Sequence, residues 1–131
     1  MTFQVQHESD RQYDGGDLAQ FFEFRDLGIR EVTQGRVGAR VIRCAGTDRV
    51  KAGSHSHSVD FQMIYILKGW ARFWYDGHGI VELREGSCVH QPSGLAHREI
   101  EHSDDFKILE ITMPASFGTD LSDRDETSEG T

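Results

Sequence analysis

Long apolar runs and clustered positive charge are both scarce in this sequence, and each scarcity argues against a class of protein. No segment approaches the roughly 20 apolar residues that a membrane-spanning helix needs, and the polar first residues lack the apolar stretch of a secretory signal. We therefore expect a cytoplasmic protein without membrane contact. The formal charge is −8, and no cluster of lysine and arginine could bind a phosphate backbone, so nucleic acid is not expected as a partner.

Cysteine is also rare, with Cys44 and Cys88 as the two copies. Their number allows one disulfide, but a reducing cytoplasm would keep both thiols free, and cysteine is common as a small core residue. We expect two buried free thiols rather than a bridge.

The chain of 131 residues has the length of one domain, and its 14 glycines and 2 prolines suggest frequent turns rather than long helices. Short β-prone runs recur along it, and Asp76-Gly77 is typical of a tight hairpin. The only helical alternative is a short one at 18–24. Seven or so strands with no long helix predict an all-β barrel or sandwich. The expected strands are 36–45, 61–67, 71–75, 80–83, 87–91 and 107–112.

Three regions follow from composition. Residues 1–28 are polar apart from the aromatic residues Phe21, Phe22 and Phe24, and we interpret them as an N-terminal arm or edge strand in a dimer contact. Residues 29–117 hold the β-prone runs and form the expected barrel. Residues 118–131 contain five acids against one base and almost no apolar side chain, which predicts a disordered tail.

Two histidines separated by one residue, His55 and His57, are the first sign of chemistry. On a strand both rings leave the same face, where neutral imidazoles can bind a divalent metal ion. Gln62 follows at an odd offset, so it can join them only if the chain breaks at 58–60. A buried amide there needs a partner. That partner could be a metal or a backbone group, and an outward-facing position remains the simpler alternative.

A second pattern opens at Gly86 and ends with His97 after a turn made by Pro92 and Gly94. From the residues alone His97 would be a surface loop histidine, or a side chain turned back over the mouth of a barrel. His7, His78 and His102 are expected at the surface.

The two patterns together resemble the two motifs of the cupin superfamily. The run from His55 to Gly69 reads H-x-H-x4-Q-x6-G, and the run from Gly86 to His97 reads G-x5-P-x-G-x2-H. The resemblance implies a small single-domain cupin with a double-stranded β-helix fold (a jelly-roll barrel). It also implies one divalent metal ion on His55, His57, Gln62 and His97. The usual glutamate of the first motif is replaced by Gln62.

The identity of the metal stays open among Zn, Fe, Mn and Ni. A glutamine contributes no charge, so the site would keep the full +2 charge of the ion and attract an anionic substrate more strongly than a glutamate site. His90 shares a strand face with Cys88, and if that face looks inward, His90 is a candidate catalytic acid or base.

Three functions remain open from the sequence. The first is a metal-dependent enzyme for a small, anionic organic acid or sugar derivative, with dioxygenase or isomerase and lyase chemistry equally compatible. The second is a non-catalytic cupin that binds a small ligand. The third is a structural barrel with buried histidines. Sheet extension at an exposed edge would also make the protein a homodimer.

Overall fold

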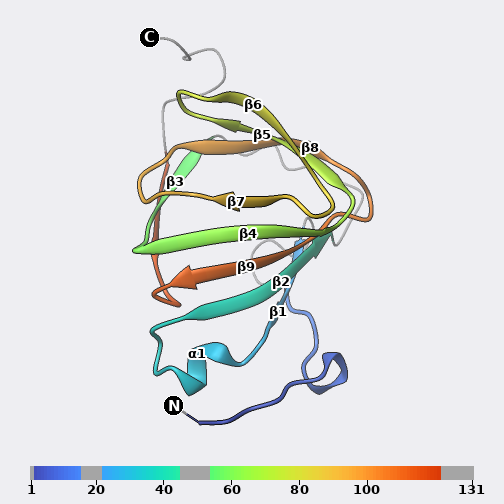
Figure 1. The fold of residues 1–131 in the computed structure, drawn as a ribbon, viewed down its shortest axis with the longest axis vertical. Coiled ribbons are helices and arrows are strands. Elements are labelled where there is room, and N and C mark those ends of the chain that lie inside the picture. Colours follow the sequence, from blue (N-terminus) through green and yellow to red (C-terminus); the bar gives the residue numbers. More distant parts are fainter. Residues whose placement is uncertain (1, 16–21, 45–53, 122–131) are drawn as a thin grey trace.

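Two facing antiparallel β-sheets of five strands each make up the computed structural model, which describes residues 2–15, 22–44 and 54–121. The first sheet has the strand order β1-β2-β9-β4-β7 and the second the order β10-β3-β8-β5-β6 (Figure 1). The described helices are the 3-10 turn Glu8–Asp10 and the α1 turn Ile29–Val32. The strands are β1 Phe22–Asp26, β2 Gly38–Cys44, β3 His55–Ser58, β4 Phe61–Lys68, β5 Trp70–Tyr75, β6 Gly79–Arg84, β7 Cys88–His90, β8 His97–His102, β9 Lys107–Met113 and β10 Gly118–Leu121.

Every β-prone run of the sequence is confirmed as a strand, and the fold is the jelly-roll barrel that the sequence predicts. Residues 22–24 of the helical alternative lie in β1, and residues 18–21 fall outside the described residues. The described part of the chain contains no helix long and apolar enough to cross a membrane.

Residues 118–121 correct the expectation of a disordered tail from 118 onward. They form β10, which pairs with β3 so that Thr119 lies opposite His57. Their side chains are exposed, so the backbone ladder and the contact with β3 order this segment rather than apolar burial. The rest of the expected tail, 122–131, lies outside the described residues.

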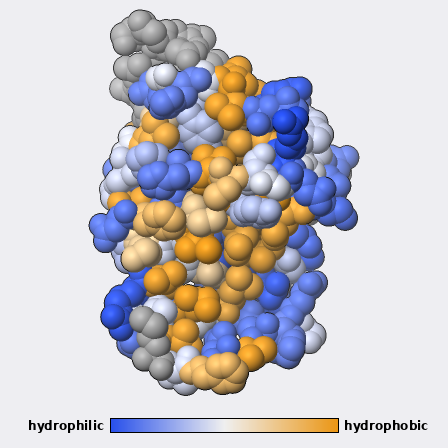
Figure 2. Space-filling model, in the orientation of Figure 1, coloured by the Kyte–Doolittle hydropathy of each residue, from blue (hydrophilic) through white to orange (hydrophobic). Residues whose placement is uncertain are grey.

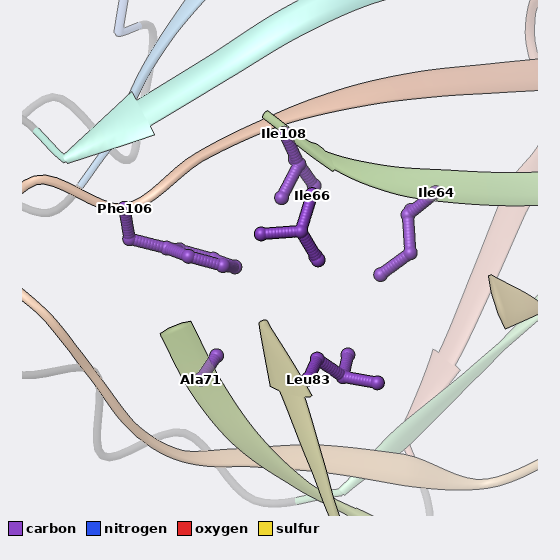
Figure 3. Packing of buried hydrophobic residues seen from close by; sticks show 6 residues of the cluster. All are labelled: Ile64, Ile66, Ala71, Leu83, Phe106 and Ile108. Atoms are coloured by element: carbon purple, nitrogen blue, oxygen red, sulfur yellow. The ribbon is translucent and has the colours of Figure 1, made fainter. Parts of the chain in front are cut away.

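The inner face of the barrel is apolar at one end. Ile64 and Ile66 of β4 and Ile108 of β9 point toward Ala71 and Leu83 of the opposite sheet (Figure 3). The exposed fraction of Ile66 is 0%, and β-branched side chains of this kind fit a pleated buried surface. This cluster is the hydrophobic core.

The same strands carry polar side chains toward their other end. On β4 the inward residue before Ile64 is Gln62, and on β9 the inward residues after Ile108 are Glu110 and Thr112. All three polar residues are buried. The barrel interior therefore changes from apolar to polar along its length.

Both cysteines are free of disulfides, as expected, but their surroundings differ from the expectation. Cys88 is exposed because it lies on the outer face of β7. Cys44 is partly buried, with its Sγ 3.1 Å from Nδ1 of His102. His102 is itself 3% exposed, which corrects its expected place at the surface, whereas His7 and His78 are exposed as predicted.

Gly69 between β4 and β5 has a left-handed backbone with φ of 77° and no room for a side chain. A Cβ atom there would overlap Oγ of Ser103 and lie 2.7 Å from Oδ1 of Asp105. We expect Gly69→Ala to lower the free energy of unfolding by about 1–2 kcal/mol for the backbone alone, with a similar further loss from the overlap.

The hairpin glycine Gly77 provides the matched control, since its φ is 79° and no atom lies within 4 Å of an added Cβ. Gly77→Ala should show the backbone cost alone. Urea denaturation of both variants measures the difference, and equal losses would contradict the overlap at Gly69.

Candidate metal centre

Three histidines from two strands of the second sheet meet at the polar end of the barrel. His55 and His57 stand on β3, and His97 opens β8 directly opposite His55 in the strand register. The ring centroids lie 4.4 Å apart for His55 and His97, 4.9 Å for His55 and His57, and 5.1 Å for His57 and His97. One ring nitrogen of each lies within 4.8 Å of the others, a spacing that could hold a single metal ion.

Hydrogen bonds at Nδ1 orient two of these rings, those of His97 and His57. Nδ1 of His97 donates to the backbone carbonyl of Leu95 at 3.0 Å, because a carbonyl oxygen only accepts. That proton leaves the lone pair of the neutral ring on Nε2, the arrangement typical of a metal-binding histidine. Nδ1 of His57 lies 2.9 Å from the hydroxyl of Thr119 on β10.

Burial and mutual proximity keep the rings of His57 and His97 neutral. Desolvation lowers the pKa of His57 to about 4, and the nearby His97, His55 and Arg40 lower it in the same direction. Desolvation likewise lowers the pKa of His97 to about 4, helped by His55 and opposed by the hydrogen bond to Leu95. Neutral imidazoles at neutral pH are the form that binds a metal ion.

The stability of the metal-free protein should depend on pH for the same reason. Between about pH 6.5 and pH 4 the unfolded chain binds more protons than the folded chain, so the free energy of unfolding falls as the pH is lowered through that window. Urea denaturation after treatment with a chelator would measure the slope. His97→Asn should flatten it, whereas His78→Asn in the exposed hairpin should not, and equal slopes in all three proteins would contradict the assignment.

Gln62 lies in the same interior, on the first sheet. β3 ends at Ser58 and β4 begins at Phe61, so the chain breaks at the place that the odd offset from His57 requires. The side chain is 2% exposed, and its Nε2 donates to Oε2 of Glu110 at 3.2 Å. The outward-facing alternative for Gln62 is therefore wrong.

The structure places His90 on the outside of the barrel, away from the three histidines. In the register of β7 and β4, His90 lies opposite Met63, while Val89 lies opposite Ile64 and packs on the core. His90 is exposed and stacks on Phe61 with ring centroids 5.6 Å apart. The strand face that carries Cys88 and His90 thus looks outward, and the condition for an acid or base role at the centre is not met.

A cavity of about 290 Å³ opens beside the polar end of the first sheet. Its wall includes the inward residues Arg40, Glu110 and Thr112 and the ring of Phe117, which also contacts His57 with ring centroids 5.2 Å apart. Arg30 lies at the same cavity and donates from Nη2 to the hydroxyl of Ser116 at 2.7 Å. Phe117 therefore contacts the histidine cluster and also forms part of the cavity wall.

Other interior polar groups were not expected from the sequence. The phenol of Tyr75 donates to Oε1 of Gln91 at 2.8 Å, and burial raises the pKa of Tyr75 above its usual value. Glu110 forms an ion pair with Arg40. The signal for Glu110 was present, because it falls on the same parity as Ile108 and Thr112 in a β-prone run.

Comparison with known proteins decides the family. The model of the family described as "Cupin domain" matches residues 46–112, just over half of the chain. The chain belongs to the cupin family. No curated protein matches this cupin.

Solved structures agree on the fold. The polyketide cyclase RemF from Streptomyces resistomycificus superposes with a TM-score of 0.73 at 16% identity, over 97% of this cupin and 90% of that chain. Oxalate decarboxylase from Bacillus subtilis, studied as a protein with Mn(II) centres, gives 0.62 at 20% identity, over 86% of this cupin and 30% of its own chain. A sugar phosphate isomerase of the cupin superfamily from Silicibacter pomeroyi gives 0.58 at 17% identity, over 78% and 67%. The chain thus spans less than a third of the oxalate decarboxylase that it resembles.

Proposed function

We propose that this cupin is a metal-dependent enzyme that acts on a small, anionic organic acid or sugar derivative. The observation that carries the proposal is the convergence of three histidine nitrogens within 4.8 Å of one another, at the polar end of the barrel. The similar solved structures add support, since they include a polyketide cyclase, an oxalate decarboxylase and a sugar phosphate isomerase. These names denote enzymes with small-molecule substrates.

The proposed ligands are His55, His57, His97 and Gln62. The imidazoles suit a zinc, iron, manganese or nickel ion, and the amide oxygen of Gln62 supplies a neutral fourth donor. Support for Gln62 comes from its burial in the same interior and from its amide NH₂ group, which is turned toward Glu110 and leaves the oxygen on the other side.

A divalent ion on these donors would supply a Lewis acid that polarises a substrate oxygen and lowers the pKa of bound water. The protein side chains would bind and orient the substrate. The guanidinium of Arg30 donates to the hydroxyl of Ser116 and forms no ion pair among the described residues, so its charge is available to a substrate carboxylate at the cavity. The hydrophobic ring of Phe117 would cover the substrate beside His57.

Metal analysis tests the proposal. Protein refolded with Zn²⁺, Mn²⁺ or Fe²⁺ and then dialysed should retain close to one ion per chain, and less than about a tenth of that would leave a structural barrel only. The loaded protein would then be offered oxalate, a keto acid, a uronate and a sugar phosphate, with products followed by NMR. Saturable binding without any product would favour the alternative, a cupin that binds a small ligand without turnover.

We also propose a homodimer. The first sheet exposes apolar residues on its outer face, including Tyr65, Leu67 and Met113, and Figure 2 shows apolar surface over the middle of this side of the molecule. The aromatic residues of the expected contact have another role, because Phe22 lies against the buried His102 and Phe24 lies under Arg40. Phe21 falls outside the described residues. Light scattering should report twice the chain mass, and 14.8 kDa would contradict the dimer.

A further inference from the structure

A buried carboxylate lies directly behind the proposed amide ligand. Glu110 on β9 is 8% exposed and lies diagonally across from Gln62 on the neighbouring strand β4. One carboxylate oxygen accepts from Nε of Arg40 at 2.7 Å, and the other accepts from Nε2 of Gln62 at 3.2 Å. The guanidinium of Arg40 is itself held over the ring of Phe24, 4.4 Å from the ring centroid. The side chains of Phe24, Arg40, Glu110 and Gln62 thus form one continuous chain of contacts.

This chain of contacts determines the orientation of the Gln62 amide. An ionised carboxylate only accepts hydrogen bonds, so the NH₂ group must face Glu110 and the carbonyl oxygen must face away from it. With an apolar residue at position 110, both orientations of the amide would be similar in energy. With a carboxylate there, reversing the amide would bring two oxygens together inside a buried site.

The arrangement also accounts for glutamine at position 62. A glutamate there would place a second carboxylate about as close to Glu110 as the amide nitrogen is now, at 3.2 Å. Two carboxylates at that distance repel each other and cannot both stay ionised at low cost. The first cupin motif usually carries a negative charge on its ligand. Here Glu110, which lies behind Gln62, carries the negative charge, and Arg40 balances it.

We propose that Glu110 is a positioning residue of the metal centre, which acts through Gln62 by holding its amide oxygen toward the histidines. This inference rests on the proposed metal site. It assigns no contact between Glu110 and the metal. Carboxylates that hold a ligand in place commonly change metal affinity by about 10–100-fold when they are removed.

The test compares Glu110→Gln with wild-type protein loaded with Co²⁺. Glu110→Gln keeps the shape of the side chain but offers Gln62 both a donor and an acceptor, so the amide loses its single orientation. We expect Co²⁺ to bind about 10–100-fold more weakly and its visible absorption band to shift. Affinity would be measured by competition with a chromophoric chelator.

The matched control is Glu23→Gln, which breaks the ion pair of Glu23 with Arg43 on the outer face of β1 and β2. Affinity in that control should stay within about twofold of wild type. Urea denaturation of each metal-free variant separates a loss of stability from a loss of affinity, because a purely structural role would move the unfolding midpoint and leave the absorption band unchanged.

A double-mutant cycle with Gln62→Ala distinguishes positioning from a simple charge effect. If Glu110 acts through the amide, Glu110→Gln should change affinity by less than about twofold when Gln62 is already alanine. A full loss in that background would overturn the proposal, as would wild-type affinity and spectrum in Glu110→Gln alone. A wild-type protein that binds no Co²⁺ would instead overturn the proposed function, and the two failures are therefore distinguishable.

Discussion

Replacing His97 with alanine should abolish stable metal binding. His97 is 4% exposed. The distance between its ring centroid and that of His55 is the shortest among the three pairs of histidines. Its Nδ1 is fixed by the carbonyl of Leu95, so Nε2 is the proposed metal ligand that the variant removes. Because loss of a group behind a ligand already costs about 10–100-fold in affinity, loss of the ligand itself should cost more than about 100-fold.

Zn²⁺ competition against a chelator, together with metal analysis after dialysis, measures this loss. Two exposed histidines serve as controls: His78 in the hairpin and His90 on the outer face of β7. Alanine at either position should leave the affinity unchanged. A His97→Ala protein that keeps one ion per chain, with an affinity within about threefold of wild type, would remove the basis of the proposed function.

Replacing Ile66 with alanine should produce a large loss of stability, because its side chain is among the largest that are fully buried in the described residues. The side chain is 0% exposed, lies at the centre of the apolar end of the barrel and packs with residues from both sheets. Removing its outer carbons leaves a cavity, and the side chains of the two sheets that surround it can fill it only in part. The free energy of unfolding should therefore fall by about 2–5 kcal/mol.

The next residue along β4 is the control. Leu67 points to the outer face and is 37% exposed, so Leu67→Ala should cost well under half as much. Urea denaturation of the two metal-free variants gives the comparison. Metal affinity should stay unchanged in Ile66→Ala, because the core lies at the opposite end of the interior from the histidines. Similar losses of stability in the two variants would contradict the assigned faces of β4.

The strands of the barrel core could be predicted because their local composition matches their environment. Runs such as Phe61–Lys68 are rich in aromatic and branched residues and are bounded by turns. β8 and β10 were not predicted, because their sequences, HREIEH and GTDL, are polar. Both strands are held by backbone pairing with strands that are distant in the chain. Local propensity does not report such pairing.

The candidate site was predicted from spacing, but the direction of individual side chains was not. His90 and Gln91 are adjacent, and a strand points one outward and the other inward, so only the pairing of β7 with β4 decides between them. His102 stands in a polar stretch, and it is buried against Cys44, 58 positions away, and against the ring of Phe22. Contacts of that kind are not readable from a local motif.

The change from apolar to polar along the barrel interior has a practical consequence for engineering. Substitutions at Ile66, Phe106 and Leu83 would change the stability of the protein, while the polar groups at the other end of the interior stay as they are. Conversely, changes at the exposed cavity residue Arg30 would leave this apolar core intact. Stability and the proposed metal binding would thus depend on opposite ends of the same barrel.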